Sequence, residues 1–492
     1  MAYFLLHTGQ PSAKRLMRQV PRLHTYQSSS GIAQIDTVIR WGLSDESDPP
    51  NGRVLNPRDA ILRTTSRVKM VKSLRKLGIR CAPRQQLKNG LLGLTQQFRV
   101  PVFDMHPLSC FRSDAAPVWI NQRIQRIQDN FEEVSVSEDR LTRRVIRLST
   151  RTLHALGLDF GLVSIGVSAR GLLYILDVTP HPVLTGKMLQ LFGKAVSDFV
   201  ERTETMLADA PLSVTLGTDM ELMLRNPVGK MVLASNYFTR KGRVGCDDRS
   251  VRMDGKRLPL LELRPNPEDN PLQLVTNLRD AMVEASSKIN RANVEWRAGS
   301  MPFKPYSTGG HIHFSGVQLS SHLIKVLDQY LAIPLMLVEA TDTASQRRPK
   351  YGFLGDFRQK EWGFEYRTPA SFIVSREVTT AAYCLAYVIA VHHFDLPTID
   401  IYEPAIEEAF YTGDSAAFIP IMQRNVAVLR RLRTYERFQQ YIEPLFLMSE
   451  AGTTWDEGVD VRTVWDIPLK RPVAKTAVRR TRQRRQRARA TG

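Results

Sequence analysis

Four short segments of the chain each place two hydrogen-bonding or metal-binding side chains two residues apart, with apolar residues between and beside them. Successive side chains of a strand point to opposite faces, so each segment would present its polar pair on one face of a sheet. The eight paired positions hold one Asp, three Glu, two His and two Arg, with no Lys, Ser or Thr. They are Asp219, Glu221, Glu262, Arg264, His311, His313, Glu365 and Arg367.

This composition differs from that of an ordinary half-exposed sheet, in which the outward positions of each strand are usually filled with residues such as Thr, Lys, Ser and Gln. Carboxylates together with imidazoles suit Mg²⁺ or Mn²⁺, and arginines can hold phosphate or carboxylate oxygens with two parallel hydrogen bonds. A zinc hydrolase is the rival interpretation of the His-x-His pair, but carboxylates outnumber imidazoles and the chain has no HExxH sequence. The set therefore favours metal-assisted phosphoryl transfer.

The segments that must position these side chains alternate between strand and helix patterns without a strict βαβ repeat, which predicts a mixed, largely antiparallel α+β domain. Expected strands cover residues 212–224, 231–234, 259–264, 309–315 and 363–368, and expected helices cover 271–296, 320–339, 376–394 and 403–448. The preceding half predicts helices over 57–77, 139–156 and 185–208 and strands over 98–104, 162–167 and 172–178.

Composition shifts divide the chain into four expected parts. Residues 1–55 are polar, with loops at Ser28–Gly31 and Asp48–Gly52, and are expected to form an N-terminal segment or cap. One domain is expected over 56–210 and a second, carrying the paired residues, over 211–468. Residues 469–492 form a basic tail that cannot bury a core and is expected to be disordered.

Overall composition excludes several classes of protein. The 492 residues exceed what one core usually organises, and 43% apolar with 24% charged residues excludes a mainly disordered, collagen-like or disulfide-rich chain. We expect no membrane-spanning helix, since the apolar stretches fall short of about 18 residues, and no secretory signal peptide at Met1–His7. Four widely spaced cysteines favour a reduced, cytoplasmic setting.

The net charge of +19 is concentrated in two stretches. Lys470–Gly492 contains ten Lys or Arg and no acid, and so does Ala60–Phe103. The tail is consistent with a weak contact to nucleic acid or another polyanion, and equally with a purely solubilising segment. The second stretch is either a solvated helix face or a surface for an acidic substrate or nucleotide phosphates.

Several of the paired segments also resemble known motifs. Thr308–Ser315 resembles the Gly-x-Gly-x-His-x-His-x-Ser sequence of glutamine synthetases, and Phe364–Pro369 resembles their Glu-x-Arg-x-Pro segment. A closer resemblance, over about residues 215–395, is to the phage phiEco32-like COOH-NH2 ligases, type 2, which are amidoligases of the glutamine synthetase-like superfamily. The matching motifs, in the same order, are Gly217–Glu221, Val244–Asp247, Glu262–Pro265, Gly310–His313, Arg348–Arg358 and Gly363–Arg367.

This resemblance implies a glutamine synthetase-like domain that uses ATP to phosphorylate a carboxylate, which an amine then attacks to form an amide. The substrates would be a carboxylate and an amine from a metabolite, a peptide or a protein terminus. The implied ligands of two or more Mg²⁺ (or Mn²⁺) ions are Asp219, Glu221, Glu262, His311 and Glu365. Arg264, Arg358 and Arg367 would act on phosphate or substrate carboxylate, with Arg264 and Arg367 also binding ATP.

The preceding half carries a fainter resemblance to ATP-grasp ligases. Leu77–Pro83 and Tyr174–Pro182 resemble an entry turn and a closing metal-binding strand of that α/β fold. The usual Glu-x-Asn metal pair is replaced here by Asp177-Val-Thr179, and a usual acid on the preceding strand is replaced by Ser164. We therefore expect a shortened, degenerate ATP-grasp-like domain without activity, in which Asp177 is structural.

Two alternative functions remain open at this point. A kinase of the same superfamily would transfer phosphate to a guanidino or carboxyl group without forming an amide. A nucleic-acid-associated or phage structural protein could keep the fold without catalysis, which the basic tail mildly favours.

Overall fold

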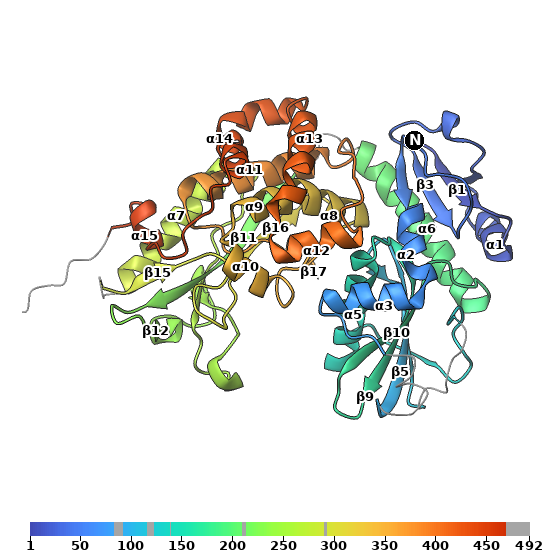
Figure 1. The fold of residues 1–492 in the computed structure, drawn as a ribbon, viewed down its shortest axis with the longest axis horizontal. Helices are drawn as coiled ribbons and strands as arrows, with labels where there is room; N and C mark the ends of the chain where they lie inside the picture. The colour runs from blue at the N-terminus through green and yellow to red at the C-terminus, as the bar shows by residue number, and fades with distance from the viewer. Residues whose placement is uncertain (83–91, 116–122, 138, 209–212, 290–292, 469–492) are drawn as a thin grey trace, which may run out of the picture.

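The computed structural model describes residues 1–82, 92–115, 123–137, 139–208, 213–289 and 293–468, which form three sheets in succession along the chain (Figure 1). The basic tail and part of the stretch between Leu77 and Phe98 therefore lie outside the described residues. The four cysteines are all free and buried.

The first sheet is a small parallel one in the order β2-β1-β3-β4. Its strands are β1 (Tyr3–His7), β2 (Leu23–Thr25), β3 (Thr37–Trp41) and β4 (Arg53–Leu55), and it is accompanied by α1 (Pro11–Gln19) and a 3-10 turn, η1 (Ser29–Gly31). The sequence predicted only a polar segment or cap here. The strands escaped prediction because each has at most five residues, and β3 is buried throughout, so no alternating pattern marks it.

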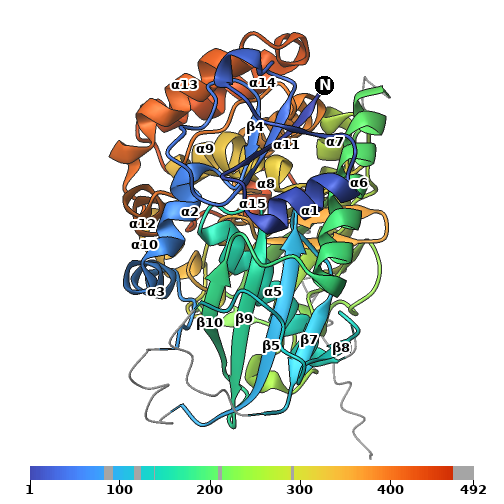
Figure 2. The same ribbon diagram turned by 90° about the vertical axis from the view of Figure 1, so that its right-hand side faces the viewer.

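The second sheet is antiparallel, in the order β10-β9-β5-β7-β8, with β6 paired to β5 (Figure 2). Its strands are β5 (Leu94–Phe103), β6 (His106–Pro107), β7 (Cys110–Ser113), β8 (Glu132–Val134), β9 (Phe160–Ser168) and β10 (Leu173–Thr179). The helices of this region are α2 (Arg58–Thr65), α3 (Arg67–Lys76), α5 (Arg140–Ala155) and α6 (Gly186–Ala208). The helix predicted over 57–77 is divided in two, because the Ser66 side chain accepts a hydrogen bond from Lys69 N and starts α3.

The third sheet is antiparallel and holds the segments with paired polar residues. Its order is β13-β14-β11-β16-β18-β17, and β12 and β15 also pair with β11. The strands are β11 (Thr215–Arg225), β12 (Met231–Val232), β13 (Val244–Cys246), β14 (Leu260–Leu263), β15 (Glu295–Arg297), β16 (Gly310–Ser315), β17 (Phe357–Lys360) and β18 (Gly363–Tyr366). The prediction of a mixed, largely antiparallel arrangement of helices and sheet is thus confirmed.

Helices cover one face of the third sheet and extend to the end of the described chain. They are α7 (Pro271–Lys288), α8 (Ser321–Leu327), a π-helical segment η4 (Asp328–Ala332), α9 (Ile333–Val338), α10 (Thr341–Arg347), α11 (Arg376–His392), α12 (Pro404–Thr412), α13 (Ile419–Leu429), α14 (Arg433–Glu450) and α15 (Val461–Val464), with short 3-10 turns η2 (Ala234–Asn236), η3 (Val251–Met253) and η5 (Ser415–Ala417). The helix predicted over 271–296 ends at Lys288, because residues 295–297 instead pair with β11. Alternate strand residues such as Leu222, Leu261 and Phe314 join these helices in the largest core.

One stretch, Ser321–Val338, has the length and apolar composition of a membrane-spanning helix, whereas the sequence analysis expected none in the chain. It comprises α8, η4 and α9, and all of it is buried inside the protein. Complete burial is what a core helix of a large domain requires, so this stretch is accounted for by packing within the protein.

A buried polar contact joins helix α5, which packs on the second sheet, to the part of the chain that holds the third sheet. Asp328, at the start of η4, accepts hydrogen bonds from Gly355 N at 2.9 Å and Tyr366 OH at 2.6 Å on Oδ1. On Oδ2 it accepts one from Tyr402 OH at 3.0 Å, and His154 Nε2 of α5 lies 2.6 Å away. The carboxylate therefore ties a helix of the first half to the segments on both sides of β17.

Substitution of Gly355 should weaken this contact. Gly355 has a φ of 68°, and an added Cβ would overlap the buried imidazole of His154. Gly171 is a matched control, since its φ is 70° but nothing lies within 4 Å of an added Cβ. Both alanine variants place a Cβ on backbone in the left-handed region, which is strained. Overpacking should lower the free energy of unfolding of Gly355→Ala by about 1–3 kcal/mol more than that of Gly171→Ala. Equal unfolding temperatures of the two variants by circular dichroism would contradict this.

Candidate active site

The register of the third sheet brings the paired polar residues together on one face. In the central strand β11, Asp219 is paired with His311 of β16, and Glu221 is paired with Glu262 of β14. His313 of β16 is paired with Glu365 of β18. The alternation within each strand then directs these side chains away from the core helices. The pattern within each strand predicted that its polar pair shares one face. Pairing of the strands then joins these separate pairs into one polar face across the sheet.

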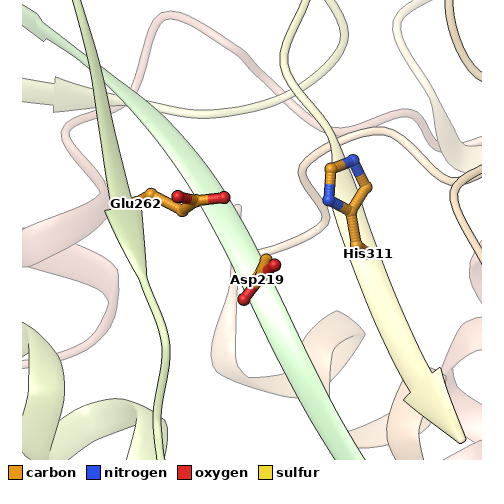
Figure 3. Close-up of side chains that lie close together, drawn as sticks. All are labelled: Asp219, Glu262 and His311. Carbon is orange, nitrogen blue, oxygen red and sulfur yellow. The ribbon is translucent and has the colours of Figure 1, made fainter. Parts of the chain in front are cut away.

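These residues form three overlapping trios, in each of which the potential ligand atoms all lie within 4.8 Å of one another. One trio, drawn in Figure 3, consists of Asp219, Glu262 and His311 from three adjacent strands. The other two are Asp219 with His313 and Glu365, and Glu221 with Asp247 and Glu262. The last two trios share no residue, so the donors present could hold two divalent ions side by side.

The electrostatics of the face fit this interpretation. Burial, reinforced by the nearby charge of Asp219, raises the pKa of Glu262 to about 8. Burial also raises the pKa of Glu221 and lowers the pKa of His311 well below its usual value, with Arg367 adding to the latter effect. Raised pKa values of buried carboxylates and a lowered pKa of a buried imidazole are what crowded oxygen and nitrogen donors show without a cation. A divalent ion would favour the ionised carboxylates and bind the neutral imidazole.

Loop residues hold Glu221 in place. Its carboxylate is fully buried, pairs with Arg249, and accepts hydrogen bonds from Gly309 N at 2.8 Å and Tyr351 OH at 3.0 Å. The same Tyr351 hydroxyl contacts His311 Nε2 and lies 3.4 Å from Arg367 Nη2. Tyr351 thus connects two of the predicted ligands with one of the predicted arginines.

The three predicted arginines all lie beside predicted carboxylate ligands. Arg264 pairs with Glu262 and also donates to Cys246 O at 3.1 Å. Arg358 Nη1 lies 3.3 Å from Glu365 Oε2, and Arg367 Nε lies 3.9 Å from the same oxygen. These guanidinium groups have further N–H donors with which to hold an anion.

The polar face opens into a cleft of about 670 Å³. Every predicted site residue lines it except Glu221, which lies buried directly beneath, behind Arg249 and Tyr351. The lining also includes seven charged residues that the site prediction omitted, namely Arg147, Arg240, Asp247, Asp248, Arg249, Lys350 and Lys360. A cleft that combines carboxylates, imidazoles and guanidinium groups is suited to bind a metal–nucleotide complex and a further anion.

Some of the omitted residues carried a sequence signal. Asp247 and Tyr351 lie within the motifs Val244–Asp247 and Arg348–Arg358 that support the family resemblance. Lys360 follows Arg358 at the same two-residue spacing as the other pairs. Arg249 and Arg147 carried no such signal, because one reaches the site from a loop and the other from α5 of the first half.

The residues at the positions of the expected ATP-grasp metal pair make local structural contacts. Asp177 Oδ2 accepts a hydrogen bond from Ile124 N at 2.8 Å, and Thr179 Oγ1 donates to Ile124 O at 3.1 Å. Both side chains of β10 therefore fasten the segment at Ile124 to the second sheet. This arrangement supports the structural role expected for Asp177.

Comparison with known proteins gives one family match. The family model described as phage phiEco32-like COOH.NH2 ligase-type 2 matches residues 216–467. This range contains every predicted site residue and all strands of the third sheet except the first residue of β11. A search of curated proteins finds no match to the chain.

Solved structures give only slight similarities. The ATP-grasp ligase PsnB, complexed with minimal precursor, Mg and ADP, is 10% identical, with 41% of this chain and 96% of that chain covered and a TM-score of 0.30. The macrocyclase MdnC from Microcystis aeruginosa is 8% identical (40% and 99% covered, TM-score 0.28), and D-alanine–D-alanine ligase from Bacillus anthracis is 10% identical (42% and 96% covered, TM-score 0.30). Similarities of this size decide neither the fold nor the function of any part of this chain.

Removal of one carboxylate should weaken binding of a divalent ion. We expect Glu262→Gln, which keeps the shape but removes the charge shared by two trios, to lower the affinity for Mn²⁺ by at least about 10–100-fold. Because Glu262 without metal keeps its proton up to about pH 8, wild-type affinity should rise as the pH approaches 8. Calorimetric titration with Mn²⁺ alone measures both effects. Glu361→Gln, at an exposed carboxylate outside the cleft, is the matched control, and an equal loss there would refute the assignment.

Proposed function

Because the chain belongs to the phage phiEco32-like COOH.NH2 ligase-type 2 family, we propose that it is an ATP- and Mg²⁺-dependent amidoligase, which joins a carboxylate to an amine through an acyl phosphate. The observation that carries this proposal is the convergence of three ligand trios and three arginines in and directly beside one cleft within the matched range. We infer a glutamine synthetase-like fold for residues 211–468 and a shortened ATP-grasp-like fold for 56–210. A cytoplasmic location agrees with the free cysteines and the use of ATP.

The reaction would take place in two steps. A carboxylate oxygen of the first substrate attacks the γ-phosphorus of ATP, the bond from that phosphorus to the bridging oxygen breaks, and ADP leaves with the electron pair. The amine nitrogen of the second substrate then attacks the acyl carbon, phosphate leaves, and the nitrogen loses a proton to solvent. Amide formation is thereby coupled to the release of ADP and phosphate.

The side chains of the cleft have distinct roles in this scheme. Asp219, Glu221, Glu262, His311 and Glu365 would hold two Mg²⁺ or Mn²⁺ ions, with His313 and Asp247 as additional donors. Bound divalent ions would offset the charge that develops on the phosphate oxygens. Arg264 and Arg367 would hold the nucleotide phosphates, and Arg358 with Arg367 would steady the group in transfer.

The alternative functions are less well supported. A non-catalytic protein would have no need to keep Glu221 and Glu262 buried among other acids, an arrangement that disfavours their charged forms. A kinase of the same superfamily would need the same metals and arginines, so the cleft is equally suitable for it. The two functions differ in one respect, because only a ligase makes phosphate release depend on an amine.

Steady-state assays should show ADP release that requires both a carboxylate and an amine. We would screen carboxylates with hydroxylamine as the amine, because attack on an acyl phosphate then yields a hydroxamate that is measured directly. Glu262→Gln and His311→Ala should each lower turnover by about a hundredfold or more, since loss of about 3 kcal/mol of transition-state stabilisation corresponds to that factor. Glu361→Gln should leave turnover unchanged. Phosphate transfer to the carboxylate without dependence on the amine would favour the kinase instead.

A further inference from the structure

Charges in the cleft are divided between its two ends. In the part of the chain from β11 to Arg264, the charged residues that line the cleft are Asp219, Arg240, Asp247, Asp248, Arg249, Glu262 and Arg264. Acids therefore outnumber cations at this end. The charged residues contributed by α5 and residues 350–367 are Arg147, Lys350, Arg358, Lys360, Glu365 and Arg367, with Glu365 the one acid. Because β13-β14 and β18-β17 lie at opposite edges of the sheet, one edge suits cations and the other suits anions.

One of the cations at the anion-suited edge comes from the first half of the chain. Arg147 lies on α5, and its Nη2 is 3.5 Å from Asp356 Oδ1, whose side chain is fully buried. Asp356 O in turn accepts a hydrogen bond from Arg367 N at 2.7 Å. Asp356 therefore contacts both the guanidinium of Arg147 and the backbone of Arg367, and the cleft is lined by both of these arginines.

The position of Arg147 is fixed by the packing of the next two turns of α5. Arg151 lies over the ring of Phe353, with its guanidinium carbon 3.8 Å from the ring centroid, and donates to Leu77 O at 2.7 Å. His154 contacts Asp328 and leaves no room for a side chain at Gly355. Residues 147, 151 and 154 share one face of the helix, so this face packs along the whole loop that leads into β17.

We propose that Arg147 is a catalytic residue of the ligase cleft, supplied by the first half, which binds the phosphoryl group as it passes from ATP to the carboxylate; this rests on the proposed function. One metal of the nucleotide would bind at the acid-rich edge, to the trio of Glu221, Asp247 and Glu262, whereas the γ-phosphate is the terminal and most highly charged part of the nucleotide. It would therefore extend toward the edge formed by Arg147, Lys350, Arg358, Lys360 and Arg367. The first half of the chain then takes part in the reaction without binding a nucleotide of its own.

Nucleotide binding with and without the γ-phosphate tests this role. Calorimetric titration of the full chain with Mg-AMPPNP and with Mg-ADP separates the γ-phosphate from the rest of the nucleotide. Arg147→Ala should raise the Kd for Mg-AMPPNP about tenfold, the lower end for a charge-assisted hydrogen bond, and change the Kd for Mg-ADP less than about twofold. Arg147→Lys, which keeps the charge but not the planar fork, should recover part of the loss.

Arg143→Ala is the matched control, since Arg143 is exposed one turn earlier on α5 and does not line the cleft. The side chain of Arg147 is 56% exposed, so its removal should leave the unfolding temperature unchanged. Three outcomes would overturn this inference but not the proposed function. They are equal affinities of wild type and Arg147→Ala for Mg-AMPPNP, an equal loss of Mg-AMPPNP affinity in Arg143→Ala, and an equal loss of Mg-ADP affinity in Arg147→Ala. A wild-type protein that binds neither nucleotide would overturn the proposed function as well.

Discussion

The carboxylate of Asp328 is the constraint on which the geometry of the cleft depends. It is fully buried, and each of its four partners comes from a different part of the chain, namely His154, Gly355, Tyr366 and Tyr402. Burial, with the charge of Asp328 next to it, raises the pKa of Tyr366 and Tyr402, so both phenols remain hydrogen-bond donors. Tyr366 is the last residue of β18 and lies between Glu365 and Arg367 in the sequence, so the contact that holds Tyr366 also sets the positions of two cleft residues.

The same contact determines how the two halves of the chain are related. Further buried polar contacts surround it: Lys325 Nζ lies 2.7 Å from Asp159 Oδ1, and Ser321 donates from N and Oγ to Asp104 Oδ1 at 2.7 and 2.9 Å. Polar groups of this kind must meet in one arrangement, because each would be costly if left buried without its partner. The first half therefore packs on the loop that leads into β17 and borders the cleft, although the family match begins only at residue 216.

How far the sequence predicts the site depends on how local each pattern is. The pairs in β11 and β16, and those that begin in β14 and β18 and end one residue beyond them, could be recognised because a period of two is visible within a few residues, and their spacing already implied a common face. Tyr351 and Arg249 reach that face from loops, and Arg147 reaches it from helix α5, which packs on the second sheet. Only the tertiary structure therefore relates these residues to the site. The first sheet was missed for a similar reason, since strands of three to five residues give too short a pattern. Helix α7 ends before its predicted end at residue 296, because Trp296 pairs with Leu224 of β11 instead.

Alternation along the four site strands also determines how the chain can vary in length. In β11, Asp219 and Glu221 face the cleft, while Met220 and Leu222 are completely buried in the core. Leu261, Ile312 and Phe364 alternate with ligands in the same way in the neighbouring strands. Insertion or deletion of a single residue within any of these strands would exchange the two faces beyond that point, turning carboxylates into the core and leucines into the cleft. Changes in length are therefore confined to the connections between the strands, where such an exchange does not arise.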